Sequence, residues 1–140
     1  TILQAARTCD NFFCLNAAPA KPVPHELLEH VDLLVVNEIE ARVLGEELNS
    51  YRGLLASTFG ANGAILSRNN EQIANAKPPR VDVVDTTGAG DAFTAARTVA
   101  LVSGMQPQQA LERACIVGAL ATTELGAQSS PTLQEVQRLE

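Results

Sequence analysis

The residues best suited to chemistry lie in one nine-residue stretch, Asp85-Thr86-Thr87-Gly88-Ala89-Gly90-Asp91-Ala92-Phe93. Two glycines flanking an alanine let the backbone approach a ligand closely, and a helix predicted to start near Asp91 would point its free N–H groups into that space. Gly88, Ala89 and Gly90 are therefore predicted to form an anion hole that stabilises a phosphoryl group during transfer. Asp91 is the candidate base that takes a proton from a substrate hydroxyl.

A purely structural interpretation of this stretch is also open. The helix dipole favours a carboxylate in the first turn, so Asp91 could serve only the helix terminus, and the glycines could serve only a tight turn. Two other nucleotide-binding classes fit poorly. The stretch lacks the third glycine and the later acidic residue of a dinucleotide-binding loop, and the chain has no G-x-x-x-x-G-K-[ST] loop.

The elements that must position this stretch follow from hydrophobic patterning. The aliphatic run 32–37 is typical of a parallel strand covered on both faces. Strands and helices alternate at first and helices dominate the end, which predicts an α/β fold with three layers, α/β/α. Strands are predicted at 11–16, 32–37, 54–58, 63–67, 72–74 and 81–84, and helices at 1–7, 25–30, 38–44, 91–103, 107–124 and from a Ser130-Pro131 start to Leu139.

Composition excludes several functional classes. The chain has 140 residues, 46% of them hydrophobic, which is enough for one compact body over 1–140. A net charge of −6 with dispersed cations argues against a nucleic-acid surface, and the apolar runs are too short for a membrane span. Cys9, Cys14 and Cys115 predict reduced thiols in a cytoplasmic protein. His25 and His30 lack neighbours at zinc-ligand spacing.

The stretch 85–93 closely resembles the C-terminal signature of the ribokinase, or phosphofructokinase B, family of carbohydrate kinases. The resemblance is strongest to ribokinases. It implies an ATP-dependent phosphotransferase acting on a hydroxyl of a small sugar, with Asp91 as the base and Gly88, Ala89 and Gly90 as the anion hole. We expect this chain to be the nucleotide-binding, catalytic C-terminal half of such an enzyme.

Three weaker stretches occur in the order that the family requires. Residues 16–20 are similar to a strand-end loop of ribokinases and favour ribose as the sugar. Asn37 and Glu40 match the family's N-x-x-E, which implies nucleotide positioning and Mg²⁺ held by Glu40 through water; a helix cap followed by a first-turn acid is the alternative. Residues 57–63 resemble the T-x-G-x-x-G turn, which implies that Thr58, Gly60, Ala61 and Gly63 contact the nucleotide; a plain glycine hairpin is the alternative.

The resemblance also implies a monovalent cation, K⁺, beside the anion hole. The family segment that closes over this ion is similar to residues 121–130. Its ligands would be Asp85, Ser130 and the carbonyl oxygens of Thr87, Ala121, Glu124 and Gly126.

The chain departs from the family in two places. The glycine-rich substrate segment and the lid of the N-terminal half are absent, so we expect a longer parent with sequence before Thr1. The lid forms family dimers, which leaves a homodimer open for a full-length parent. The segment 44–58 is short, so a piece is expected to be missing there. These gaps leave a second hypothesis, a truncated, non-catalytic module that binds nucleotide or a partner.

Overall fold

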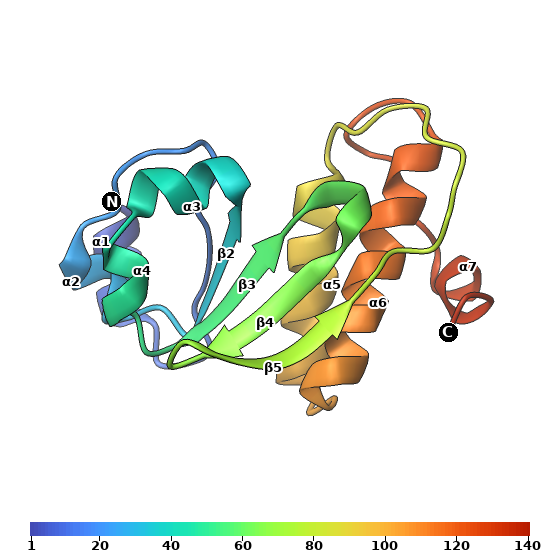
Figure 1. Cartoon of the computed structure of the whole chain (residues 1–140). Coiled ribbons are helices and arrows are strands. Elements are labelled where there is room, and N and C mark those ends of the chain that lie inside the picture. Colours follow the sequence, from blue (N-terminus) through green and yellow to red (C-terminus); the bar gives the residue numbers. More distant parts are fainter. The chain divides into compact units, whose positions relative to one another are not determined.

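A computed structural model describes residues 1–140 and shows alternating strands and helices, which confirms the α/β class (Figure 1). The strands are β1 (Cys14–Asn16), β2 (Leu33–Asn37), β3 (Leu54–Thr58), β4 (Ala64–Arg68) and β5 (Glu71–Ala76). The α-helices are α1 (Ile2–Thr8), α2 (His25–Leu28), α3 (Glu38–Leu44), α4 (Glu47–Ser50), α5 (Ala89–Val102), α6 (Pro107–Leu120) and α7 (Leu133–Gln137). Two 3₁₀ turns, η1 (Gly60–Asn62) and η2 (Ala121–Thr123), complete the set.

The chain divides into two compact units, which are described separately. The first comprises Thr1–Phe59 and Ile65–Ile73, and the second comprises Gly60–Ala64 and Ala74–Glu140. The prediction that residues 1–140 belong to a single domain remains a prediction. None of the helices has the length and apolar character that crossing a bilayer requires.

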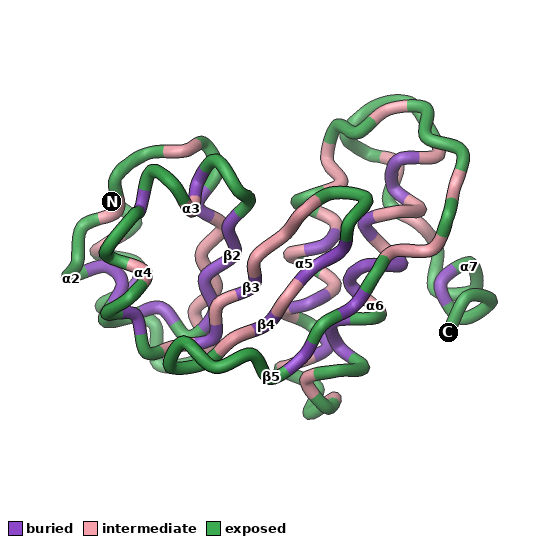
Figure 2. Tube along the Cα trace, in the orientation of Figure 1, coloured by how far each residue is buried: buried purple, intermediate pink, exposed green.

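The first unit is organised around parallel strands. β1 pairs with β2 and β2 pairs with β3, both in parallel, with Leu33 opposite Leu54. β2 is the most buried strand, since Leu33, Leu34 and Val36 have no exposed surface (Figure 2). An aliphatic strand with both faces covered explains this burial. The predicted strand 32–37 is therefore confirmed.

The five strands form a sheet in the order β1-β2-β3-β4-β5. β4 runs opposite to β3 and β5, as the arrowheads in Figure 1 show. Asn69 and Asn70 form the turn between β4 and β5 with positive φ angles of 52° and 63°. Two left-handed residues, a conformation that asparagine tolerates, are typical of a tight hairpin turn.

In the second unit α5 and α6 pack against each other. Gly118 of α6 faces the start of α5, where an added Cβ would lie 3.3 Å from Phe93 Cβ and 3.4 Å from Ala89 O. Ala110, Leu111 and Ala114 on the same helix have no exposed surface. Small residues thus let the two helices approach closely near the predicted anion hole.

Several predicted boundaries are wrong. Residues 81–84 form no strand, because the amides of Val84 and Asp85 donate to Thr122 O rather than to a neighbouring strand. The helix from Pro107 ends at Leu120 and continues only as the 3₁₀ turn η2. The last helix is capped by Thr132 instead of Ser130, since Thr132 and Glu135 form a reciprocal capping box.

The connection between α3 and β3 also differs from expectation. The short helix α4 occupies part of it, within the segment that was expected to lack a piece. Tyr51 follows α4 with its side chain buried, and its hydroxyl donates to Val31 O at 2.9 Å and to Leu54 O at 3.3 Å. The short segment therefore reaches β3 in an ordered, hydrogen-bonded path.

Candidate active site

The carboxyl ends of β2 and β3 bring two predicted nucleotide-binding residues together. Asn37 ends β2, Thr58 ends β3, and the parallel register places them directly opposite each other. The Thr58 hydroxyl donates to Val36 O at 3.3 Å. Open parallel sheets bind ligands at the carboxyl ends of their strands. The register thus joins residues that are 21 positions apart in the sequence.

Asn37 and Glu40 form a complete capping box at the start of α3. Asn37 Oδ1 accepts from the amides of Ile39 and Glu40, each at 2.9 Å. The Glu40 carboxylate accepts from Asn37 N at 2.7 Å and from Asn37 Nδ2 at 3.0 Å, and it is only 5% exposed. Both carboxylate oxygens are therefore engaged inside the protein. The helix-cap interpretation of this motif is confirmed.

The turn between β3 and β4 needs its second glycine. Gly63 has a φ of 104°, and an added Cβ would lie 2.1 Å from Ala76 O. Gly60, with a φ of 55°, has no neighbour within 4 Å at that position and is exposed, as is Ala61. The close approach of Ala76 O explains why residue 63 is a glycine. Nothing lies within 4 Å of the position that a Cβ of Gly60 would take, so this part of the turn is open.

The start of α5, where an anion hole is predicted, has no side-chain cap, and the amide of Ala89 donates to Thr86 O at 3.3 Å. Gly88 is the N-cap with a left-handed φ of 80°, and no side chain forms a capping hydrogen bond at the helix terminus. An added Cβ at Gly90 would meet nothing within 4 Å, which leaves open space beside the first turn. The helix runs for 14 residues, enough for its dipole to favour an anion there. It begins at Ala89, two residues before the predicted start.

Asp91 lies in this first turn and is exposed. The side chain is therefore on the solvent side of α5 rather than in the core, where Phe93 is buried. A carboxylate in this position can reach a substrate hydroxyl that approaches the helix terminus. The structure thus brings together Gly88, Ala89, Gly90 and Asp91.

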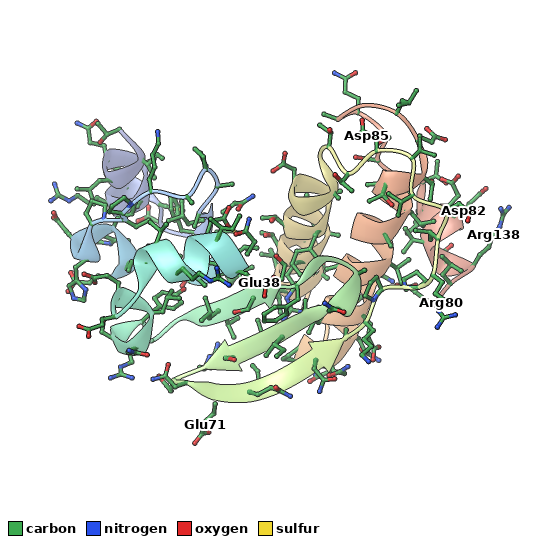
Figure 3. All side chains as sticks on the ribbon, turned by 45° about the horizontal axis from the view of Figure 1, so that its top comes forward. Glu38, Glu71, Arg80, Asp82, Asp85 and Arg138 are labelled. Atoms are coloured by element: carbon green, nitrogen blue, oxygen red, sulfur yellow. The ribbon has the colours of Figure 1, made fainter.

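Asp85 anchors the chain before α5 to the loop that follows η2. Its Oδ1 accepts from Thr87 N at 2.9 Å and Thr87 Oγ1 at 2.7 Å, and its Oδ2 accepts from Gly126 N at 2.9 Å. These hydrogen bonds hold the pKa of Asp85 below its ordinary value, and the bond from the Thr87 amide has the largest effect. Figure 3 shows Asp85 on the segment that leads into α5.

The Ser129 hydroxyl lies within hydrogen-bond distance of two of the predicted K⁺ ligands. Its Oγ lies 2.8 Å from Ala121 O and 2.7 Å from Gly126 O. Ser130, which was predicted as a ligand, is exposed and so is Glu124. The left-handed turn at Gly126, with a φ of 90°, precedes this segment. The hydroxyl that approaches both carbonyl oxygens is therefore that of Ser129, which the sequence interpretation missed.

The chain has no group of three or more His, Cys, Asp or Glu side chains that could hold a metal ion. A cation near Asp85 would depend on backbone and hydroxyl oxygens. A cavity of about 550 Å³ also lies in the second unit, and none of its lining residues was predicted to be in the site. It is lined by the connection after β5, one face of α6 and the end of the chain, including Lys77, Arg113 and Leu139.

The chain is similar to several known proteins over most of its length. Ribokinase from Bacillus subtilis is 39% identical in an alignment of 132 residues, which covers 89% of this chain and 45% of the relative. The structure of Arabidopsis thaliana ribokinase complexed with ribose and ATP has a TM-score of 0.86 at 28% identity, over 99% of this chain and 51% of that one. A structure from Escherichia coli in complex with ATP and Mg²⁺ has a TM-score of 0.69 at 28% identity, over 81% and 40% of the two chains.

The chain therefore spans about half the length of the relatives it matches. The model of the pfkB family of carbohydrate kinases matches residues 1–133, nearly the whole sequence. The α5 terminus, the ends of β2 and β3 and the Asp85 anchor all lie within that match. This chain belongs to the pfkB family of carbohydrate kinases.

Proposed function

We propose that this chain is the nucleotide-binding and catalytic part of an ATP-dependent kinase that phosphorylates a hydroxyl of a small sugar, ribose first among the candidates. The observation that carries the proposal is the start of α5, where the uncapped helix terminus at Gly88 to Gly90 and the exposed Asp91 share one turn. The Arabidopsis relative, solved with ribose and ATP, supports both substrates.

The proposed reaction needs a base and an anion hole. Asp91 accepts the proton of the sugar hydroxyl while the hydroxyl oxygen forms a bond to the γ-phosphorus of ATP. The bond from that phosphorus to the bridging oxygen breaks, and its electron pair leaves with ADP. The amides at the start of α5 stabilise the charge on the moving phosphoryl group. Gly90 leaves room for that group because it carries no side chain.

The nucleotide would lie along the ends of β2 and β3. Asn37 and Thr58 are neighbours there, and Gly60, Ala61 and Gly63 follow in the next turn. Glu40 accepts one hydrogen bond from Asn37 on each oxygen and is only 5% exposed, which leaves little room for a metal ion to bind it directly. A role through water fits better, since Mg²⁺ commonly keeps several of its waters. Mg²⁺ would neutralise charge on the phosphates, as the E. coli complex with ATP and Mg²⁺ suggests.

The oxygens near Asp85 fit a monovalent cation. Two carbonyl oxygens, from Ala121 and Gly126, approach the one hydroxyl of Ser129, which has a single proton to donate. Each carbonyl oxygen has two lone pairs, so this one proton does not use up the lone pairs of either, and a hard cation such as K⁺ suits those that remain. Asp85 and the Thr87 carbonyl complete the proposed set, with the positive charge stabilising the anion hole nearby.

The proposal is tested by joining this chain to the N-terminal half of a family member and measuring ribose-dependent release of ADP. Asp91→Asn is expected to reduce kcat by two to four orders of magnitude, the usual contribution of a general base. Asp82→Asn is the matched control, because Asp82 is an exposed aspartate on the connection before α5 (Figure 3). Equal turnover by wild type and Asp91→Asn would remove Asp91 from the reaction.

Measurements on the same joined protein distinguish the kinase hypothesis from the hypothesis of a non-catalytic module. A kinase releases ADP only when a sugar acceptor is present. Binding of ATP without any turnover, across pentoses, hexoses and nucleosides, would instead favour the module. The panel also ranks the acceptors against ribose.

A further inference from the structure

The start of α5 meets the end of α6 at a residue that has no side chain. Gly118 lies in the last turn of α6 and is buried. A Cβ added there would lie 3.3 Å from Phe93 Cβ and 3.4 Å from Ala89 O, so these neighbours would have to shift. Ala89 is the first residue of α5 and the middle residue of the predicted anion hole. A side chain at position 118 would therefore displace the backbone of the anion hole.

Backbone conformation does not explain why residue 118 is a glycine. Gly118 is not among the glycines with a positive φ, and glycine inside a helix is less favourable than alanine. Ala110 and Ala114 lie on the same face of α6, at intervals of four residues, and both are fully buried. This face of α6 thus accommodates a methyl group at two positions and lacks one at the position that meets the anion hole.

The same end of α6 also holds the segment that leads into α5. The 3₁₀ turn η2 continues α6, and its Thr122 carbonyl oxygen accepts from the amides of Val84 at 2.8 Å and Asp85 at 3.1 Å. The Thr122 hydroxyl donates to Ala119 O at 2.7 Å, which ties η2 to the last turn of α6. The segment before the anion hole and the first residue of α5 are therefore both in contact with one short piece of chain. A shift at Gly118 would move one relative to the other.

We propose that Gly118 is a positioning residue for phosphoryl transfer, an inference that rests on the proposed function. Because it has no side chain, the end of α6 can set the position of the first turn of α5, which carries the anion-hole amides and the Asp91 carboxylate. Gly118 acts on the reaction only through Ala89. The effect is large because a misplacement of catalytic groups by about 1 Å can lower the rate by about 100-fold.

The test is steady-state kinetics of the joined kinase, with release of ADP measured against ribose and ATP. Gly118→Val should lower kcat by about 10- to 100-fold, because its side chain displaces the first turn of α5. KM for ribose should stay within about twofold, since the anion hole acts on the transition state rather than on the bound sugar. Gly118→Ala covers the case in which the valine variant does not fold, and it should lower kcat by about three- to tenfold.

Ala110→Val is the matched control. Ala110 is fully buried on the same face of α6, near the other end of the helix and about 12 Å from Gly118 along its axis. Overpacking at either position should lower the Tm. The control should keep kcat within about twofold of the wild type, because it adds volume far from the anion hole. A purely structural role for Gly118 would make the two valine variants alike in kcat.

Amide chemical shifts of the 140-residue chain test the same inference without turnover. Gly118→Ala should move the amide resonances of Gly90 and Asp91, whereas Ala110→Val should leave them in place. The inference is overturned if those resonances do not respond to Gly118→Ala, if the two valine variants reduce kcat equally, or if KM for ATP rises at unchanged kcat. A joined wild type that releases no ADP would contradict the proposed function instead, and the amide shifts would still show whether Gly118 positions the first turn of α5.

Discussion

Replacing Gly88 by alanine should destabilise the protein more than the same change at Gly104. Both glycines are left-handed, with φ angles of 80° and 82°. Alanine in that conformation costs about 1–2 kcal/mol at either position. The two differ in their surroundings, because a Cβ at Gly88 would lie 3.1 Å from both Cα and O of Ala127, whereas one at Gly104 would meet nothing within 4 Å.

The extra cost at Gly88 arises because Ala127 cannot move away freely. Gly126, its neighbour, donates to the Asp85 carboxylate and is approached by Ser129. Overpacking of this kind typically costs about 1–3 kcal/mol. We therefore expect Gly104→Ala to lose about 1–2 kcal/mol and Gly88→Ala to lose about 2–4 kcal/mol.

Urea unfolding of the wild type and the two variants measures these losses, provided that the slopes against urea agree. Subtracting the Gly104→Ala loss from the Gly88→Ala loss removes the shared backbone term. The difference in unfolding free energy that remains measures how closely Gly88 packs against the loop that holds the Asp85 anchor. Equal losses, to within about 0.5 kcal/mol, would refute that packing.

Three further predictions concern the same elements. Gly90→Ala should leave the free energy of unfolding unchanged or raise it by up to about 1 kcal/mol, because the added Cβ meets nothing and lies in a helix. The same change should lower kcat of the joined kinase, because the methyl group fills the proposed phosphoryl space. Urea unfolding measures the first effect and release of ADP measures the second. For Asp85, hydrogen bonds lower the folded pKa, so its contribution to stability is present above about pH 4 and is lost as the pH falls further. Asp85→Asn should therefore be less stable than wild type at neutral pH, and Tm measured against pH should show the gap closing in acid. Asn37→Ala should lose about 1–2 kcal/mol with the helix cap, and Glu40→Gln, which can keep the reciprocal bond, should lose less in the same unfolding assay.

The parts of the fold that were predictable have strong local signals. The aliphatic run 33–36 is typical of a covered strand, and Gly88 to Gly90 before an apolar helix pattern indicated a helix start. The capping box at Asn37 is also visible in sequence because its two partners are three residues apart. Local chemistry decides each of these features.

The missed features depend on distant contacts. Residues 81–84 alternate like a strand, but Val84 and Asp85 bond to Thr122, which is nearly forty residues away. Arginine within an apolar helix pattern is normally exposed, and nothing near Arg97 in the sequence indicates that it is buried. The approach of the Ser129 hydroxyl to Ala121 O and Gly126 O depends on how the chain turns at Gly126. Tertiary packing, which neighbouring residues do not encode, decides all three.

The pairing of β2 with β3 has a consequence for natural variation in this protein. Asn37 and Thr58 are neighbours because of the strand register, so the chain that joins them does not determine their spacing. Insertions or deletions between Gly45 and Ser50, ahead of the buried Tyr51, can therefore accumulate without moving either residue. Homologues should differ most in length at this connection while both strand ends stay in place.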